Sequence, residues 1–336
     1  MSGPNPYLLG TDEARRIFDE AIVPQRLTGE PQQDPIVVVV GGQPGAGKSR
    51  AQAAVVANLG RQSTVAIDAD DLRPYHPQYE TLALQEDRSA GTYCHPDAAR
   101  WVRMAIDHAI DYRLDVVLGT SLGWAEGTQE TLQQFRGAGY RVEVVLMAVH
   151  EAQSRLGILQ RYQDERDAVG YGRLLPTAIH DATYTGVLDT ADRVDELRLA
   201  DAVSVYRRGG GQPLYANQLT DHGQWQQPPA TRSAMETERG RPWTGEETTR
   251  FRAAAESLAD RLPASLRGDL VGIVSTALAH ASAAAQDHTD AEHVASVVAH
   301  AFKTSARTPN ARTSHQPGGA APQPNRRDDR GAAPGR

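Results

Sequence analysis

Short apolar runs alternate with longer segments of helical pattern over the first two thirds of the chain. The run at 35–40 (PIVVVV) has the length and β-branched content of a strand buried in a parallel sheet. Similar short runs predict strands at 64–67, 115–118, 141–149 and 202–207. Helix-compatible segments lie around and between them, at 11–27, 50–59, 98–112, 128–136 and 151–167. This alternation predicts an α/β fold with a doubly wound parallel sheet.

The pattern changes after about residue 219. Three glycines at 209–211 predict a turn into a hairpin at 213–217, which would close an α/β domain over residues 1–220. Residues 221–243 are rich in Gln, Pro, Thr and Arg and predict a linker. Capping-box patterns at 244–247 (TGEE) and 289–292 (TDAE) open Ala-rich helices, so 244–303 predicts a helical appendage. The composition of 304–336 is typical of a disordered tail.

Composition narrows the class of protein. The 336 residues, 40% of them hydrophobic, suffice for one large α/β domain and a smaller element. A net charge of −7 gives no general attraction to nucleic acid or to an anionic membrane. The single cysteine, Cys94, excludes an intrachain disulfide framework. The sequence contains no signal-peptide pattern and no apolar stretch of membrane-spanning length, so we expect a cytoplasmic protein.

A phosphate-binding loop of Walker A type follows the first predicted strand. It reads G-x-x-x-x-G-K-S and comprises Gly42, Gln43, Pro44, Gly45, Ala46, Gly47, Lys48 and Ser49. Backbone N–H groups at the start of the following helix would hold phosphates. Lys48 would reach the β- and γ-phosphates and Ser49 would hold Mg²⁺. Since only Lys48 and Lys303 are lysines, a chain that otherwise uses arginine keeps a lysine in this loop. A glycine-rich turn without a ligand is the alternative.

Acidic residues follow the second predicted strand. The segment 67–77 (IDADDLRPYHP) contains Asp68, Asp70 and Asp71. In an open parallel sheet this position faces a bound nucleotide, where a carboxylate could accept the proton of an attacking hydroxyl. The alternative for each single aspartate is an N-cap or a loop charge. Arginines that stabilise a transferring phosphoryl group are also needed, and Arg161 and Arg173 are candidates that spacing alone does not single out.

Taken together, these motifs resemble the zeta toxin family, the kinase component of epsilon/zeta-type toxin–antitoxin systems. The resemblance covers about residues 11–217. It depends on GGQPGAGKS at 41–49 and IDADxLRxxHP at 67–77, followed by the weaker matches GT at 119–120, MAV at 147–149, LxRY at 159–162, RLLP at 173–176 and VxVYR at 203–207. It implies a P-loop kinase-like fold and ATP-dependent phosphorylation of the 3′-hydroxyl of UDP-N-acetylglucosamine.

On the nucleotide side, the resemblance implies ATP and Mg²⁺ as cofactors. Lys48 and Ser49 correspond to the nucleotide and Mg²⁺ residues of the family, and Asp68 is our further candidate for the metal. Arg161 and Arg173 correspond to the arginines that stabilise the phosphoryl group.

On the acceptor side, Asp70 corresponds to the general base, and Thr120 to a sugar-site residue. Arg73 and His76 of the second motif join Asp70 and Thr120 as candidate acceptor-binding residues. The resemblance also implies a small helical antitoxin whose N-terminal helix covers the ATP site. Alternatively, residues 244–303 restrain the enzyme in cis.

The chain departs from the family pattern at the acceptor. The helix at 98–112 has Arg103 and Met104 where a family member has a sugar-contacting Glu, and Leu118 replaces a Glu before the Gly-Thr pair. ATP use is therefore better supported than the identity of the acceptor. Two alternatives stay open: a related kinase acting on another nucleotide sugar, a nucleoside or an antibiotic, and an NTP-binding interaction module.

Overall fold

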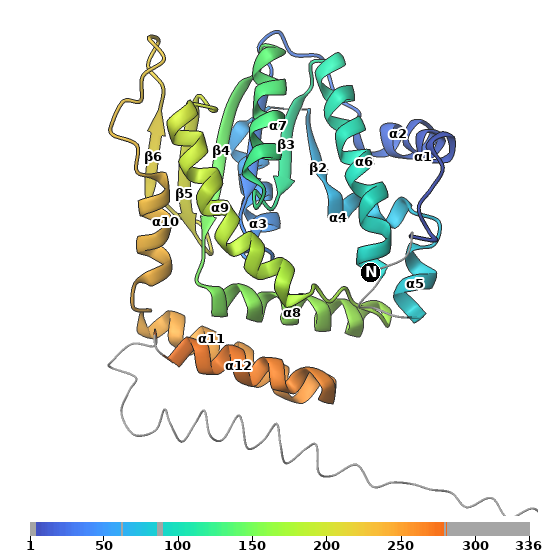
Figure 1. The fold of residues 1–336 in the computed structure, drawn as a ribbon, viewed down its shortest axis with the longest axis vertical. Helices are drawn as coiled ribbons and strands as arrows, with labels where there is room; N and C mark the ends of the chain where they lie inside the picture. Colours follow the sequence, from blue (N-terminus) through green and yellow to red (C-terminus); the bar gives the residue numbers. More distant parts are fainter. Residues whose placement is uncertain (1–4, 62, 86–89, 279, 281–336) are drawn as a thin grey trace, which may run out of the picture.

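A single six-stranded sheet forms the centre of the protein (Figure 1). The computed structural model describes residues 5–61, 63–85, 90–278 and 280. The strand order is β2-β3-β1-β4-β5-β6, and β6 alone pairs antiparallel, with β5. The strands are β1 Ile36–Gly41, β2 Thr64–Asp68, β3 Asp115–Thr120, β4 Arg141–Ala148, β5 Ala202–Arg207 and β6 Tyr215–Gln218. The predicted α/β class and parallel sheet are confirmed, with a hairpin at the β6 edge.

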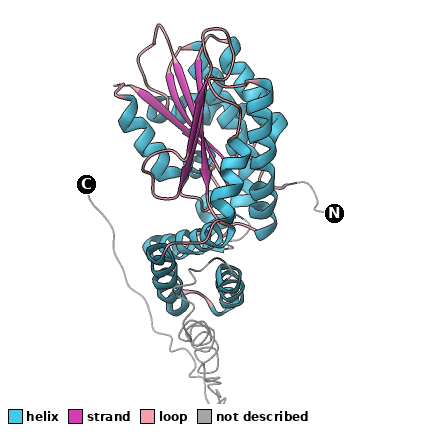
Figure 2. Cartoon of the chain, turned by 90° about the vertical axis from the view of Figure 1, so that its left-hand side faces the viewer, coloured by secondary structure: helices cyan, strands magenta, loops and turns pink. Residues whose placement is uncertain are grey.

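Helices cover both faces of this sheet (Figure 2). Those before and between the strands are α1 Thr11–Ile17, α2 Val23–Arg26, α3 Lys48–Leu59, α4 Ala69–Leu72, α5 Tyr79–Gln85, α6 Ala90–Asp111, α7 Ala125–Gly137, α8 Glu151–Val169 and α9 Thr177–Leu197. Those after the sheet are α10 Thr231–Gly240, α11 Gly245–Arg261 and α12 Arg267–Leu278. Short turns of other helix types are η1 Phe18–Ile22, η2 Arg73–Tyr75 and η3 Ala264–Leu266.

Strand β1 shows why the apolar run has no polar face. Val37 and Val39 pack into the large core that also contains side chains of α6, α7, α9 and α10. Val38 and Val40 pack on the opposite face, against α3. Because both faces are covered, every residue of the strand is buried, as is usual in parallel sheets. The strand is thereby held rigidly at the middle of the sheet.

Helix α9 lies outside every element that the sequence analysis predicted. Its sequence is rich in Thr and Asp, which have low helix propensity. Val187, Ala191 and Val194 are nevertheless fully buried in the main core, against the sheet and α7. Tertiary packing therefore stabilises a helix that local propensity does not favour.

The predicted linker at 221–243 is wrong in its central part. Residues 231–240 form α10, which packs against α9, β4 and β5. Met235 is 0% exposed and belongs to the main core. The polar composition misled the prediction because the helix is strongly amphipathic and buries only one narrow face.

Helices α11 and α12 form a second core on one side of α8 (Figure 1). Thr244 and Glu247 make the predicted capping box at the start of α11. Leu258 of α11 and Leu262, just after the helix, belong to the same core as Leu156 and Leu159 of α8. The second predicted capping box, at 289–292, and the tail at 304–336 lie outside the described residues. Within the described part of the chain, no helix is long and apolar enough to cross a membrane.

Candidate active site

The phosphate-binding loop leaves the central strand at the carboxyl edge of the sheet. Strand β1 lies between β3 and β4, so the loop faces the crevice where the strand order reverses. Gly47 is left-handed, with φ 91°, and precedes α3. A Cβ on Gly45 would collide with the carbonyl oxygen of Ser154 in α8. The glycines therefore permit both the turn of the loop and its close packing on α8.

Lys48 is folded back over the loop. Its Nζ donates to the carbonyl oxygens of Gly42, at 2.9 Å, and Gln43, at 3.4 Å. Burial lowers the pKa of Lys48 to about 8, although the nearby carboxylates of Asp68 and Asp70 act in the opposite direction. The ammonium therefore stays mostly protonated at neutral pH. Ser49, the next residue, is exposed at the start of α3.

Asp68 ends β2 and caps the short helix α4. Its Oδ1 accepts from the backbone N–H of Asp70 at 2.9 Å, and its Oδ2 lies 3.5 Å from Nε2 of Gln52. A Cβ on the neighbouring Gly119 would collide with this carboxylate. Burial, with a contribution from Asp70, raises the pKa of Asp68 to about 6. The carboxylate of Asp68 therefore binds a proton more tightly than an ordinary aspartate does, and it lies beside the start of α3.

Asp70 lies at the centre of an arginine cluster. Nη1 of Arg161, from α8, donates to its Oδ2 at 3.1 Å. Arg173, from the segment between α8 and α9, donates to both carboxylate oxygens, one of them at 2.6 Å. Arg73 of the η2 turn donates to Oδ1. Three guanidinium groups from separate segments therefore converge on one carboxylate that is itself 41% exposed.

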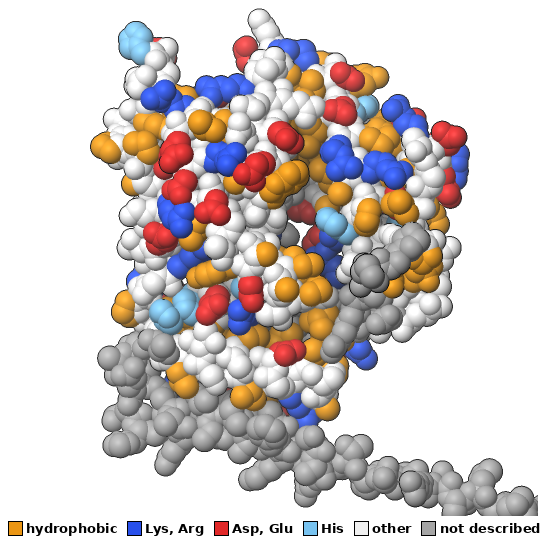
Figure 3. Space-filling model, in the orientation of Figure 1, with side chains coloured by type: hydrophobic (Ala, Val, Ile, Leu, Met, Phe, Trp, Pro, Cys, Tyr) orange, Lys and Arg blue, Asp and Glu red, His pale blue; other side chains and the backbone are white. Residues whose placement is uncertain are grey.

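The cluster keeps donors that the protein does not use. Nη2 of Arg161 and Nε of Arg73 are buried, and neither has a hydrogen-bond partner among the described residues. A space-filling view shows a hollow in the middle of the molecule, with acidic and basic side chains at its wall (Figure 3). Unpaired buried donors beside a phosphate-binding loop suit the oxygens of a transferring phosphoryl group.

The remaining predicted acceptor residues do not join this cluster. His76 is buried, with Nε2 3.0 Å from the carbonyl oxygen of Tyr7 and 3.5 Å from the carboxylate of Asp97. Its ring therefore ties the N-terminal segment to α6 and is withdrawn from the surface. Thr120 ends β3 opposite Gly41 in the sheet register, directly beside the phosphate-binding loop.

Two basic residues near the loop were missed from the sequence. Arg239 of α10 donates to Oε1 of Gln43 at 3.0 Å. Arg208, just after β5, donates to the carbonyl oxygen of Gln153 at 2.6 Å, and its Cγ lies 3.8 Å from the position of a Cβ on Gly47. Neither follows a recognisable motif. The sequence signal for Arg208 was the V-x-V-Y-R match at 203–207, which indicates that a strand ends just before this residue.

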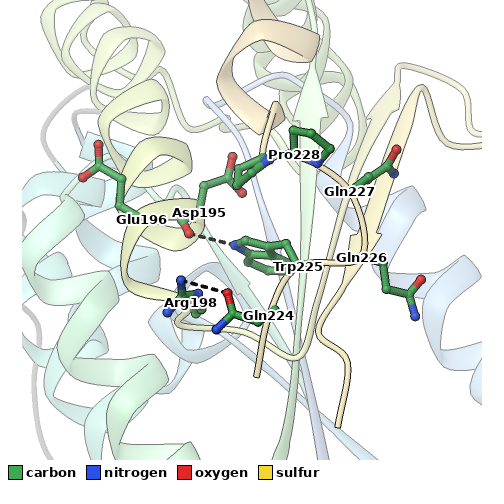
Figure 4. Close-up of a pocket in the computed structure, with 9 residues that line it drawn as sticks. Asp195, Glu196, Arg198, Gln224, Trp225, Gln226, Gln227 and Pro228 are labelled. Atoms are coloured by element: carbon green, nitrogen blue, oxygen red, sulfur yellow. Dashed lines mark hydrogen bonds between the residues drawn. The ribbon is translucent and has the colours of Figure 1, made fainter. Parts of the chain in front are cut away.

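Two cavities of about 500 and 480 Å³ lie elsewhere, and neither is lined by the phosphate-binding loop. The first lies under the segment at 224–229, where the indole of Trp225 donates to the carbonyl oxygen of Asp195 at 2.8 Å (Figure 4). The second lies between α8, the start of α9 and α12. Neither is lined by Asp70, Arg161 or Arg173.

A family model of the zeta toxin matches residues 22–220. The chain belongs to the zeta toxin family. The resemblance expected from the motifs is therefore confirmed. The candidates Asp70, Arg161 and Arg173 lie within the matched residues, and both arginines contact Asp70.

Curated relatives are toxins. Toxin PezT of Streptococcus pneumoniae serotype 4 is 25% identical over 177 residues, which cover 52% of this chain and 70% of PezT. Toxin zeta of Enterococcus hirae is 22% identical over 179 residues, which cover 53% of this chain and 62% of that toxin. The match thus spans less than two thirds of the length of toxin zeta.

The solved structure of the PezAT chromosomal toxin–antitoxin system of Streptococcus pneumoniae includes a similar chain. The similarity covers 76% of the present chain and 98% of that chain, with a TM-score of 0.64 and 18% identity. At this identity the likeness concerns the fold.

Proposed function

We propose that this protein is an ATP-dependent kinase that phosphorylates a sugar hydroxyl of a nucleotide sugar, with the 3′-hydroxyl of UDP-N-acetylglucosamine as the first acceptor to test. The observation that carries the proposal is the contact of Asp70 with Arg161 and Arg173. A carboxylate that can take a proton and cations that can bind a phosphoryl group lie on the edge of the sheet that carries Lys48. These are the groups that phosphoryl transfer needs from a protein.

The loop residues fit a bound ATP. Gly45 and Gly47 keep the loop backbone free of side chains, and Lys48 is held at its carbonyl oxygens. Ser49 and Asp68 supply the hard oxygen ligands that Mg²⁺ prefers, and they would hold the ion with phosphate and water. When bound, Mg²⁺ would neutralise charge on the β- and γ-phosphates.

In the proposed reaction, the oxygen of the acceptor hydroxyl bonds to the γ-phosphorus of ATP while Asp70 accepts the proton of that hydroxyl. The bond between the γ-phosphorus and the bridging oxygen of the β-phosphate breaks, and ADP is released. Arg161 and Arg173 bind the developing charge on the transferring group. For this, both guanidinium groups must shift from Asp70 toward the phosphate. That shift frees Oδ2 of Asp70 for the acceptor while Arg73 still donates to Oδ1, and the exposed position of the carboxylate makes it reachable.

Support for the nucleotide sugar comes from family membership and from Thr120, which ends the strand beside the loop. Leu118 is buried in the main core, so its side chain contributes nothing to an acceptor site. Arg103 is exposed on α6 and brings a cation where the family pattern has an acid. The residues expected to contact the acceptor therefore differ from the family pattern in at least one position.

We also propose an antitoxin partner that covers the ATP site. The PezAT system, which includes a chain of similar fold, pairs a toxin with an antitoxin. Helices α11 and α12 pack on α8 through Leu258 and Leu270, which belong to the second core. This packing favours a separate partner over restraint in cis by these two helices.

The test is ADP release from the purified full chain with Mg·ATP and a panel of nucleotide sugars, followed by mass and NMR analysis of the product. We expect release that depends on the acceptor, and phosphate on a sugar hydroxyl. The Lys48→Ala variant serves as the inactive control. If the protein binds ATP but no nucleotide sugar, nucleoside or antibiotic stimulates ADP release, the result would favour the interaction module and overturn the kinase proposal.

A further inference from the structure

We propose that Arg239 is a positioning residue for the phosphate-binding loop and that its charge favours an anion there. The inference rests on the proposed function, since it concerns the same nucleotide site. It extends the site to a helix beyond the residues that the family model matches, which end at 220.

Helix α10 is fixed at its start by a buried carboxylate from α9. Oδ2 of Asp195 accepts from the backbone N–H of Thr231 at 2.9 Å, and its Oδ1 accepts from the Thr231 hydroxyl at 2.7 Å. Met235 then anchors the middle of the helix in the main core. Arg239 follows one turn later on the same face of the helix. The fixed helix therefore sets the position of the Arg239 guanidinium next to the phosphate-binding loop.

The guanidinium of Arg239 is nearly inaccessible, at 5% exposure for the residue. Nη2 donates to Oε1 of Gln43 at 3.0 Å, and Nη1 donates to the carbonyl oxygen of Tyr184 at 2.7 Å. The ring of Tyr184 lies 4.0 Å from its central carbon in a cation–π contact. These contacts hold the group in one orientation.

Gln43 passes this constraint to the loop backbone. Its side chain is completely buried, and Nε2 donates to the carbonyl oxygen of Val149 at 2.7 Å. Its own carbonyl oxygen accepts from the backbone N–H of Ala46 at 3.1 Å and lies 3.4 Å from Nζ of Lys48. A change at Arg239 therefore alters the support of the residue that shapes the turn and holds the catalytic lysine.

The carboxylate of Glu236 acts on the charge of Arg239 only through space, and it is already paired with Arg232. No carboxylate in the part of the protein that the structure describes forms an ion pair with Arg239, and its Nε makes no hydrogen bond there. Burying a cation without a carboxylate is costly, and oxygens of a bound anion can compensate for that cost. The position under the loop means that phosphates in the loop would feel this charge.

The experiment measures the Kd of the full chain for Mg·ADP and Mg·ATP by calorimetry, with melting temperatures recorded separately. For Arg239→Met we expect both Kd values to rise about tenfold or more, in the range of a lost charge-assisted hydrogen bond. Arg239→Lys, which keeps the charge, should lose less. The matched control on α10 is Arg232→Met, which breaks partly exposed ion pairs on the same helix. It should keep both Kd values within twofold of the wild type.

A double-mutant cycle with Gln43→Met tests whether Arg239 affects nucleotide binding through Gln43. If Arg239 acts through Gln43, the double variant binds no more weakly than the weaker single variant. Additive losses, or a wild-type Kd in folded Arg239→Met, would overturn the inference while leaving the proposed function intact. If Arg239→Met does not fold, a wild-type Kd in folded Gln43→Met overturns the inference as well, because Arg239 is proposed to act through Gln43. A wild-type chain that binds no nucleotide would overturn the proposed function and this inference together.

Discussion

Replacing Asp70 by Asn separates the chemistry of the site from binding. The change keeps the shape of the side chain and removes the negative charge that pairs with Arg73, Arg161 and Arg173. Because the carboxylate is 41% exposed, solvent screens these pairs. We expect the loss to lower the free energy of unfolding by only about 1 kcal/mol. The variant should therefore stay folded and be suitable for kinetic measurements.

Turnover should fall much further than stability. If Asp70 is the base, kcat should drop by roughly 10²–10⁴, the usual contribution of a positioned acid–base group. The Kd for Mg·ATP should stay within a few-fold. Since Asn no longer neutralises Arg161 and Arg173, any change in nucleotide affinity should be toward tighter binding.

The assay is a coupled measurement of ADP release at saturating acceptor, with Kd from calorimetry. Asp68→Asn is the matched control, because it makes the same chemical change two residues away in a group that we assign to Mg²⁺. Its effect should appear first as a higher Mg²⁺ concentration for half-maximal rate.

Retention of more than a tenth of wild-type kcat in Asp70→Asn would refute the reasoning. So would comparable losses in both variants, each with weakened Mg²⁺ dependence. The two carboxylates would then act as one metal site, and Asp71 would be the next candidate for the base.

Further expectations concern the loop, pH, the second core and the C-terminus. Lys48→Ala should abolish phosphoryl transfer with the fold intact, and more than a tenth of wild-type turnover would contradict its role. Burial raises the pKa of Asp68 to about 6, above its value of ~4 in an unfolded chain. The folded state therefore holds this proton more tightly, and wild-type stability should fall as pH rises from about 4 to about 6. Denaturant unfolding across that pH range should show a smaller fall in the free energy of unfolding for Asp68→Asn than for the wild type. Identical profiles would contradict a raised pKa at Asp68. Leu258→Ala should lower stability by about 2–5 kcal/mol, because this side chain is buried between α11 and α8. Deleting 304–336 should leave kcat and Tm nearly unchanged, since the tail has little apolar content, and a large fall in turnover of soluble protein would show that it belongs to the site.

The outer limits of the catalytic unit could not be predicted from the sequence. The polar segment at 221–243 indicated a linker, yet Met235 and Arg239 of α10 are buried there. Helix α9 was missed because its Thr and Asp residues weaken the local signal. In both helices a few buried side chains decide the structure, and their partners are distant in sequence. A boundary at residue 220 would therefore cut through the main core.

The sequence by itself determined the strand–helix alternation, the phosphate-binding loop and the family. Those features depend on local patterns: β-branched runs, helical spacing and a short motif whose glycines and lysine have fixed tasks. It also named Asp70, Arg161 and Arg173 as candidates, but only the family resemblance, and not their spacing, placed them in one site.

Only the tertiary structure decided which candidates meet. It brought Arg161 and Arg173 to Asp70 from segments about a hundred residues away, and it withdrew His76 into a contact with Asp97. It also placed Arg239 under Gln43. The physical reason is that such contacts form where packed helices cross the edge of the sheet. The crossing is set by the shape of the whole core, which no local stretch of sequence contains.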